Sequence, residues 1–274
     1  MLIKSFQQVE ASGEIVPISH GKSTAVRVLL KSDGMGFSLS EARCGARNRS
    51  SLWYKNHWEA NYVRAGSGSL IDRDRGKEWP LKPGDLYCVG PNDRHSVANS
   101  DDPLRIISVF NPPIEGPETH DEDGAYPPTG ELPPRTDPMF VRGISDVRAA
   151  GGEKILVDGN VRALRLLTSH DQMGFSLSEV HVKASSQLDL WYKHHWEANL
   201  VLEGELLVTH RQTGEQHKLS FGDVYCVGPN DPHRLEPQTD VKLLAIFNPP
   251  LNGDEKHDAD GAYPPTGPVP SGPG

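Results

Sequence analysis

A carboxylate, a phenol and an imidazole recur at the same spacing in two halves of the sequence. The segment HWEANYVRAG starts at His57, and its counterpart HWEANLVLEG starts at His195. Residues two apart on a β-strand share a face, so each histidine points the same way as the glutamate that follows it. In GDLYCVGPNDRH and GDVYCVGPNDPH, a turn, a strand and a second turn precede a histidine. Three side chains of each half could then meet inside a barrel: Glu59, Tyr87 and His95 in the first half, and Glu197, Tyr225 and His233 in the second.

Such a set mixes oxygen and nitrogen donors, which suits iron or another first-row divalent ion. A purely structural interpretation stands beside it. The glutamate and the histidine can be a surface residue and part of a capped turn, and Tyr87 and Tyr225 can be core residues with hydrogen-bonded hydroxyls. The residues by themselves leave both interpretations open.

The chain repeats itself almost from end to end. MGFSLSE occurs at Met35 and again at Met173, an offset of 138 residues that holds through the motifs above. The offset becomes 137 residues at the two FNPP segments, and DGAYPPTG closes both halves. Each half has the size of an independently folding domain. We therefore expect one domain over residues 1–130, an exposed proline-rich connector over 131–138, and a second domain over 139–274 that ends in a Pro/Gly-rich tail.

Within each half, short apolar runs alternate with clusters of Gly, Pro, Asn and Asp, and no stretch keeps a 3.6-residue apolar period over the length of a helix. This pattern is typical of an all-β fold. Segments such as ALRLLT, GFSLSEV, NLVLEG, LLVTHR and LLAIFN are the strands expected of an antiparallel sandwich or a small barrel. Periodicity does not distinguish these two architectures.

Charge and hydropathy argue against several classes of partner. The 274 residues carry 28 Lys and Arg against 37 Asp and Glu, and the net charge of −9 opposes binding to a phosphate backbone. No run approaches the roughly 18 apolar residues of a membrane-spanning helix, and the start of the chain has no apolar block of a secretory signal. We expect a cytoplasmic protein with no nucleic-acid or membrane partner, in which Cys44, Cys88 and Cys226 are reduced.

The motifs resemble those of a known family. A Glu followed after six residues by Gly, and then a Gly-Asp strand ending in Pro and His, is similar to the two consensus motifs of cupins, small β-barrels that commonly hold a metal. More narrowly, WYKHHWEANLVLEGE, GDVYCVGPNDPH, FNPP and HDxDGAYPP resemble ectoine synthase, a single-cupin cyclase. The resemblance implies two tandem cupin domains, that is, a jelly-roll barrel duplicated in one chain.

The same resemblance implies roles for particular residues. It places a divalent metal, iron(II) or alternatively zinc or manganese, on the three donors of each half. It also implies a substrate pocket with an arginine, which anchors a carboxylate well because its guanidinium offers two parallel donors. The substrate-binding residues would be Arg27, Tyr54 and Phe110, and Arg165, Tyr192 and Phe247; the catalytic pairs that transfer protons would be Glu118 with His120, and Glu255 with His257. These pairs lie in Gly- and Asp-rich segments, where they can equally be surface residues without a task.

Some pocket positions depart from the family. The family reaction closes a ring, in which the α-amine of N-γ-acetyl-2,4-diaminobutyrate attacks the acetamide carbonyl and water leaves. A changed pocket makes another substrate plausible. The second half keeps a His pair at His194, so we expect it to be at least as competent as the first. The residues that differ are Ser108 and Ala245 at the family's pocket cysteine, Ser23 and Val161 at its pocket tryptophan, and Asn56 in place of one histidine of the pair.

The expected function is that of a metal-dependent cyclase or dehydratase, a carbon–oxygen lyase acting on a small amine-bearing carboxylic acid. An iron-dependent oxygenase with a small amino-acid-like substrate, and a non-catalytic cupin that binds a small ligand, are the alternatives. The expected partner is a small molecule. A homodimer is a further option, since the fused pair can either replace a cupin dimer interface or leave sheet edges free.

Overall fold

The computed structural model describes residues 1–272, apart from the side chains of residues 20 and 158. The chain forms two compact units. One comprises Gln8–Ile144 and is called the first barrel; the other combines Met1–Gln7 with Ser145–Gly274 and is called the second barrel. This division differs from the expected domain boundaries, because the first seven residues join the second barrel and residues 139–144 join the first.

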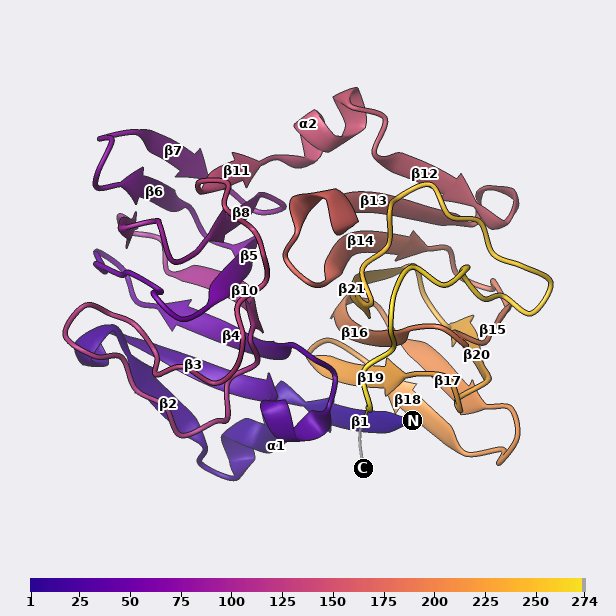
Figure 1. Cartoon of the computed structure of the whole chain (residues 1–274). Coiled ribbons are helices and arrows are strands. Elements are labelled where there is room, and N and C mark those ends of the chain that lie inside the picture. Colours follow the sequence, from indigo (N-terminus) through magenta and orange to yellow (C-terminus); the bar gives the residue numbers. More distant parts are fainter. Residues whose placement is uncertain (273–274) are drawn as a thin grey trace. The chain divides into compact units, whose positions relative to one another are not determined.

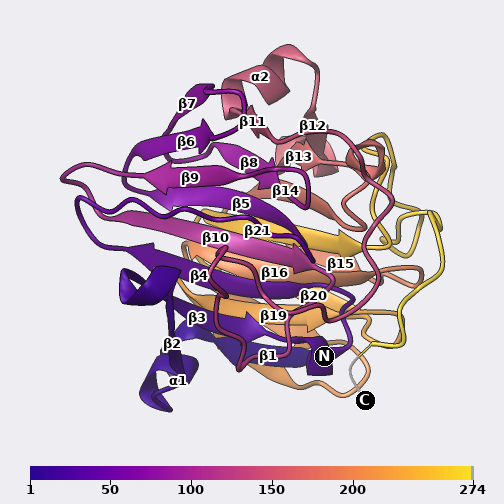
Figure 2. The ribbon, with the colours of Figure 1, turned by 60° about the vertical axis from the view of Figure 1, so that its left-hand side comes forward.

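The first barrel consists of a seven-stranded and a three-stranded antiparallel sheet, counted over the described residues. Helix α1 (Phe6–Ala11) and the 3₁₀ turns Ser19–Gly21 and Lys31–Asp33 flank its first strands. The strands are β2 (Ile15–Ile18), β3 (Ser23–Leu29), β4 (Ser38–Cys44), β5 (Trp58–Ala65), β6 (Gly68–Asp72), β7 (Glu78–Leu81), β8 (Leu86–Val89), β9 (His95–Ala98), β10 (Leu104–Asn111) and β11 (Phe140–Arg142). The larger sheet has the order β11-β8-β5-β10-β4-β3-β2, which can be followed in Figure 1, and the smaller one β7-β6-β9, whose strands are labelled in Figure 2.

The second barrel repeats this plan with a seven-stranded and a four-stranded sheet among the described residues. Helix α2 (Ile144–Ala149) precedes it, and Val157–Gly159 and Ser169–Asp171 form 3₁₀ turns. The strands are β1 (Leu2–Ser5), β12 (Glu153–Leu156), β13 (Val161–Leu167), β14 (Ser176–Val182), β15 (Leu188–Leu190), β16 (Trp196–Glu203), β17 (Leu206–His210), β18 (Gln216–Leu219), β19 (Asp223–Val227), β20 (His233–Pro237) and β21 (Val241–Asn248). The sheet orders are β1-β19-β16-β21-β14-β13-β12 and β15-β20-β17-β18.

The first strand of each half closes the large sheet that the other half builds. Strand β1 pairs with β19, so that Ile3 lies opposite Tyr225, and both ribbon views show the two strands side by side (Figures 1 and 2). Strand β11 pairs with β8 in the same way, with Val141 opposite Tyr87. Each added strand covers a sheet edge that would otherwise present unpaired backbone groups. Each barrel therefore needs residues from both halves of the sequence.

Strand alternation brings polar side chains into the barrel interiors. In β5, Glu59 and Asn61 face the inside together with Val63, which belongs to the hydrophobic core. In β16, Glu197 and Asn199 do the same. The carboxylates expected to bind metal are thus held on central strands, paired on both sides, and not on loops.

The glycine that follows each of these glutamates after six intervening residues has a steric role. Gly66 and Gly204 end β5 and β16 with φ angles of 81° and 87°. A Cβ atom would stand 2.1 Å from the carbonyl oxygen of Pro103 at Gly66, and 2.2 Å from that of Asp240 at Gly204. Only glycine combines this left-handed conformation with so close an approach. The expected motif therefore reflects the turn that sends the chain from the large sheet to the small one.

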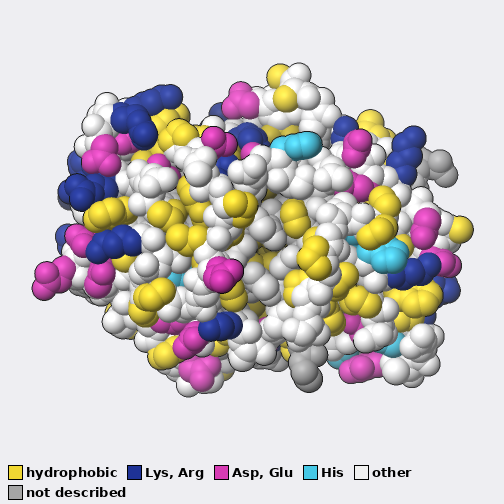
Figure 3. Space-filling model, in the orientation of Figure 1, with side chains coloured by type: hydrophobic (Ala, Val, Ile, Leu, Met, Phe, Trp, Pro, Cys, Tyr) yellow, Lys and Arg dark blue, Asp and Glu magenta, His cyan; other side chains and the backbone are white. Residues whose placement is uncertain are grey.

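The expected all-β fold of two tandem barrels is confirmed. The two α-helices of the described residues are six residues long each, and no helix there is long and apolar enough to cross a membrane. Cys44, Cys88 and Cys226 are free. Most of the connector 131–138 is exposed, but Arg135 is buried and stacks on Trp58. On the face drawn in Figure 3, basic and acidic side chains are intermixed.

Candidate functional site

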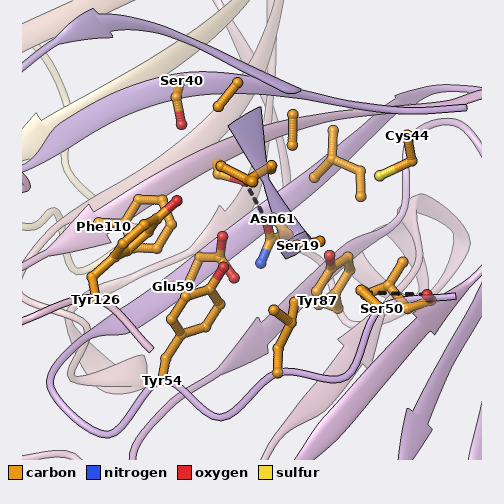
Figure 4. A pocket seen from close by; sticks show the side chains of 17 residues that line it. Ser19, Ser40, Cys44, Ser50, Tyr54, Glu59, Asn61, Tyr87, Phe110 and Tyr126 are labelled. Atoms are coloured by element: carbon orange, nitrogen blue, oxygen red, sulfur yellow. Dashed lines mark hydrogen bonds between the residues drawn. The ribbon is translucent and has the colours of Figure 1, made fainter. Parts of the chain in front are cut away.

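Each barrel encloses a cavity lined by both of its sheets. The two cavities are similar in size, about 470 Å³ in the first barrel and 530 Å³ in the second, including their mouths. Figure 4 shows the cavity of the first barrel, with Phe110 and Tyr126 at one end, Cys44 and Ser50 at the other, and Tyr87 between them. The ends differ in chemistry: one is aromatic and the other presents a thiol and a hydroxyl.

The two cavities collect different shares of the expected site residues. Four of them line the first cavity, whereas six line the second, including the arginine and the histidine that would contact a substrate. The lining residues are Tyr54, Glu59, Tyr87 and Phe110 in the first barrel, and Arg165, Tyr192, Glu197, Tyr225, Phe247 and His257 in the second.

The glutamate and the tyrosine of each expected donor set come from neighbouring strands. In the β5–β8 ladder Asn61 lies opposite Tyr87, two residues from Glu59 on the same face. In the β16–β19 ladder Asn199 lies opposite Tyr225. Diagonal neighbours on one face of an antiparallel pair are within reach of long side chains. The register therefore brings a carboxylate and a phenol together in both barrels.

The GPND turn orients the third expected donor. The carboxylate of Asp93 accepts the N–H of Gly90 at 3.0 Å, and the backbone carbonyl of Asp93 accepts from Nδ1 of His95 at 3.0 Å. A carbonyl oxygen can only accept, so Nδ1 carries the proton and Nε2 of the neutral ring keeps a free lone pair. Asp231 and His233 repeat the second of these bonds at 2.9 Å. In both barrels the turn thus fixes the tautomer that a metal ligand requires.

Burial shifts the protonation equilibria of these donors. It raises the pKa of Glu59 to about 7 and that of Glu197 to about 8, because a buried carboxylate loses its hydration. It lowers the pKa of His95 and His233 to about 4, so both imidazoles are neutral at pH 7. The pKa of Tyr225 is raised by the same desolvation and by the charge of Glu197. A cation placed among these groups would reverse the first and last of these shifts.

Three of the expected donor atoms are buried without a hydrogen-bond partner: Nε2 of His95, Nε2 of His233 and the hydroxyl oxygen of Tyr225. The rings of Tyr225 and His233 have centroids 6.4 Å apart. Buried polar atoms nearly always have partners, so this set fits a bound ion that accepts their lone pairs. Within residues 1–272, no group of three or more His, Cys, Asp or Glu side chains is placed to hold a metal. The expected set has only two such residues, because its third donor is a tyrosine.

An aromatic wall borders each donor set. Tyr54 contacts Phe110 and Tyr126 with ring centroids 5.5 and 5.7 Å apart, and Tyr192 is stacked on Tyr263 at 5.5 Å. Tyr126 and Tyr263 are not among the expected site residues. Their occurrence in the repeated DGAYPPTG segment was the available signal, because the repeat keeps that tyrosine in both halves.

The two arginines expected to bind a carboxylate are placed differently. In the first barrel Arg27 donates to the backbone carbonyls of Gly116 and Glu118, the latter at 2.9 Å, and it does not line the cavity. In the second barrel Arg165 donates to Ser178 Oγ at 3.2 Å and to the Tyr263 hydroxyl at 3.1 Å, and it lines the cavity. The lining of the second cavity therefore includes a guanidinium and that of the first does not. Each arginine nevertheless lies over the equivalent tyrosine, Arg27 at 5.1 Å from the Tyr126 ring and Arg165 at 5.5 Å from the Tyr263 ring.

The two candidate histidines make equivalent contacts with the tyrosines beside them, but only His257 is among the residues that line its cavity. His257 lines the second cavity, with its Nε2 3.3 Å from the Tyr192 hydroxyl and its ring stacked on Tyr263 at 4.2 Å. Burial and the charge of Arg165 lower the pKa of His257 to about 4. His120 is not among the lining residues of the first cavity, but its Nε2 lies 3.2 Å from the Tyr54 hydroxyl and its ring 4.5 Å from that of Tyr126. Its Nδ1 accepts the backbone N–H of Ser19 at 3.1 Å.

The glutamates of the two Glu-x-His pairs hold their own loops. Both carboxylate oxygens of Glu118 accept backbone N–H groups, one of them from Gly116 at 2.7 Å, and Arg27 lies 3.6 Å away. Glu255 accepts from the backbone of Asn252 and from that of Gly253, the latter at 2.8 Å. Neither carboxylate lines a cavity. Their contacts support a loop-positioning role.

The histidine pair of the second half is not part of the cavity. His195 is buried, with its Nε2 3.1 Å from Oγ1 of Thr266, and His57 makes the same contact with Thr129 at 3.0 Å. His194 is half-buried and does not line the second cavity. What distinguishes the second cavity is the arginine and the histidine at its aromatic end.

The fold agrees with that of two-domain cupins. The chain superposes on an oxalate decarboxylase from Lactobacillus farciminis solved as a formate complex with a TM-score of 0.65 and 14% identity, over 92% of this chain and 87% of that one. It superposes on the salicylate 1,2-dioxygenase of Pseudoaminobacter salicylatoxidans with a TM-score of 0.64 and 16% identity, over 90% and 81% of the two chains. Two tandem barrels with one polar cavity each define the chain as a bicupin.

The sequence comparisons identify the family. The model of the family described as ectoine synthase matches residues 1–130 and again residues 139–267. The L-ectoine synthase of Oceanobacillus iheyensis is 38% identical over 130 residues, which are 46% of this chain and 97% of that protein. That of Desulfosudis oleivorans is 46% identical over 103 residues, 38% of this chain and 80% of that protein. The chain belongs to the ectoine synthase family, with the family domain present twice.

Proposed function

We propose that the chain is a metal-dependent carbon–oxygen lyase that closes N-γ-acetyl-2,4-diaminobutyrate, or a close analogue, into a cyclic amidine, and that the second barrel is the catalytic one. The observation that carries this proposal is the second cavity, which holds a guanidinium, an imidazole and a Glu–Tyr donor pair within one set of walls. Family membership supports the reaction class.

The donor set fits a divalent cation. Glu197, Tyr225 and His233 offer one carboxylate, one phenol and one imidazole, and the last two end in buried atoms that lack a partner. A mixed oxygen and nitrogen set suits iron(II), with zinc or manganese as alternatives. When bound, the cation would supply Lewis acidity at the carbonyl that the amine attacks. The first barrel has the same three residue types, so we propose that it binds a metal as well.

The residues of the aromatic end would bind and orient the substrate. Arg165 offers the substrate carboxylate a charged donor inside a cavity where water competes weakly. Tyr192 and Phe247 form the wall against which the aliphatic backbone of the substrate packs. A carboxylate fixed at Arg165 places the neighbouring α-amine close to the donor set. Orientation of this kind removes much of the entropy cost of ring closure.

His257 is the proposed proton acceptor. Its low pKa keeps the ring neutral at pH 7, so it can take a proton from the attacking amine and pass it on through the Tyr192 hydroxyl. We retain Glu255 only as the residue that positions this loop. Its carboxylate is engaged by two backbone amides and does not reach the cavity.

The proposal is tested by product formation. The metal-loaded protein is incubated with N-γ-acetyl-2,4-diaminobutyrate, and the cyclic amidine is followed by proton NMR beside an oxygen electrode. We expect the product, no oxygen uptake, and loss of turnover after chelation that returns when iron(II) is added. A double variant, Glu59→Gln with Glu197→Gln, is the matched control without carboxylate ligands. Oxygen consumption without the amidine would instead support an oxygenase and contradict the proposal.

We also propose cytoplasmic residence and a small-molecule partner without nucleic acid. A second copy of the chain remains a proposed partner. Light scattering coupled to size-exclusion chromatography measures this directly, since a monomer has a mass of 30.1 kDa.

A further inference from the structure

The two cavities differ most at the end opposite the aromatic residues. In the second barrel β14 runs from Ser176, which pairs with Phe247, to Val182, which pairs with Val241. Val161 lies opposite Val182 on the next strand. This far end is therefore separated from the aromatic end by the length of β14. Glu197 pairs with Phe247 at the aromatic end, and Tyr225 pairs with Asn199 two residues further towards the far end. A ligand whose carboxylate is at Arg165 can extend from there towards Val182.

The polar groups of the far end in the first barrel are replaced by aliphatic ones in the second. Figure 4 shows Cys44 and Ser50 at this end, and Ser19, labelled nearer the middle of the view, is a further lining residue. At the offset of 138 residues, the second cavity has aliphatic side chains at all three positions. The replacements are Val157 for Ser19, Val182 for Cys44 and Leu188 for Ser50.

Two more lining positions carry a larger or less polar side chain in the second cavity than in the first. Val180 stands where the first cavity has Ala42, and Ala245 stands where it has Ser108, whose hydroxyl donates to Asn61 at 2.6 Å. The cavities have similar volumes, so the exchange changes the polarity of the walls and not the space. A hydroxyl or amide group placed against purely aliphatic walls would lose its hydrogen bonds to water without replacement. An alkyl group placed there would gain the free energy of leaving water.

The mouth of the second cavity continues this apolar surface. Val157 lines the cavity and yet is 43% exposed, whereas the equivalent Ser19 is 6% exposed. Leu156 lines the cavity beside it. An alkyl chain longer than the cavity can therefore follow aliphatic side chains out to the surface.

We propose that the second barrel recognises a carboxylate substrate whose acyl group is an alkyl chain longer than acetyl. The carboxylate binds Arg165, the reacting amide lies at the donor set, and the alkyl chain packs against Val182, Leu188 and Val157. This inference rests on the proposed cyclase function and names the substrate class of that same site. The reaction stays balanced for any chain length, because the amine forms a C–N bond to the amide carbon and the amide oxygen leaves as water.

The test is a series of N-γ-acyl-2,4-diaminobutyrates with acetyl, propanoyl and butanoyl groups. We expect kcat/KM of the metal-loaded full chain to rise by about three- to fourfold for each added methylene, the factor for burying a CH₂ group. Calorimetric titration of the metal-free protein should give dissociation constants in the same order. Equal values along the series, or the best value for acetyl, would overturn the inference while the cyclase function stands. Turnover of none of the three would overturn both.

A variant with the first barrel's residues at the far end sharpens the test. In Val182→Cys with Leu188→Ser, the far end carries the same thiol and hydroxyl that the first barrel accommodates. We expect the preference for longer chains to fall to less than about twofold per methylene, with a thermal unfolding transition that stays cooperative. An unchanged preference in a folded variant would place the alkyl chain elsewhere and contradict the proposal. The single variant Leu188→Ser gives the intermediate point.

Discussion

In the first barrel Arg27 is held by two backbone carbonyls and lies outside the cavity, whereas in the second barrel Arg165 lies in the lining and donates to Ser178 and Tyr263. The donor residues of the two barrels are the same, and their strand registers are the same. Duplication has thus kept the same residue types in both copies, whereas the arginine and the histidine line the cavity of the second barrel and not that of the first. Under the proposed function, this difference predicts that substitutions can impair substrate binding without impairing metal binding.

The largest expected effect is on substrate binding. Arg165→Met should lower kcat/KM by about 100-fold or more, mostly through KM, because the substrate carboxylate loses a buried charged partner. Arg27→Met should change kcat/KM by less than about threefold and should instead lower the free energy of unfolding by about 2 kcal/mol, since buried carbonyls lose their donor. Steady-state kinetics and urea unfolding of both variants measure this. Equal kinetic losses in the two variants would remove the distinction between the barrels.

A smaller effect is expected at the histidines. His257→Gln should reduce kcat by about 10- to 100-fold with little change in KM, the lower end of the range for proton transfer, because a pKa of about 4 is far from the working pH. His120→Gln is the matched control and should leave kcat within about twofold. A kcat that falls in His120→Gln and not in His257→Gln would assign catalysis to the first barrel.

The lowered pKa of His257 also predicts that the free energy of unfolding depends on pH. Its folded-state pKa of about 4 lies below the usual value of 6.5, so the unfolded chain binds the proton more readily. The contribution of the neutral His257 ring to the free energy of unfolding is complete above pH 6.5 and is lost as the pH falls from 6.5 to 4. Between pH 7 and pH 5, the free energy of unfolding of the metal-free protein should therefore fall by about 2 kcal/mol more than that of the metal-free His257→Gln variant. Urea unfolding at the two pH values measures this difference. Parallel pH profiles for the two proteins would contradict the burial of a neutral ring.

The smallest expected effect concerns the hydroxyl that distinguishes the cavities near the glutamates. Ser108→Ala removes the hydrogen bond to Asn61 and should lower the free energy of unfolding by about 1 kcal/mol. Turnover should stay unchanged if the second barrel is the catalytic one, as proposed, because that barrel already has Ala245 at this position. Urea unfolding and steady-state kinetics of Ser108→Ala measure the two expected results. A marked loss of turnover would show that the first cavity takes part in the reaction.

Much of the architecture was predictable because the sequence repeats long motifs in order, and a repeat of domain size with strand-like patterning leaves few folds. The exchange of β1 and β11 was not predictable. Strands of four and three residues carry no local signal for the sheet they join, since a backbone edge accepts any partner. The expected connector at residues 131–138 follows the sequence repeat, which carries no signal for this exchange of strands.

The site shows a similar limit. Strand alternation predicted that Glu59 and Tyr87 point to the same side of their sheet. The turn before His95 was also predictable from its Gly-Pro-Asn-Asp sequence. The contrasting positions of Arg27 and Arg165 were not, because both occupy the same register on equivalent strands. The side chain of Arg27 is held by the backbone carbonyls of Gly116 and Glu118, and this loop approaches the arginine only in the folded molecule. Identical motifs therefore predicted equivalent sites, and tertiary contacts made them different.

The most direct test of this account is to compare Glu59→Gln with Glu197→Gln, measuring bound iron per chain and turnover of the same preparations. Each variant should lose about half of the bound iron, because each removes one carboxylate ligand from one of two equivalent donor sets. Only Glu197→Gln should lose turnover, by about 100-fold or more. Loss of turnover in Glu59→Gln with activity retained in Glu197→Gln would contradict the assignment of catalysis to the second barrel.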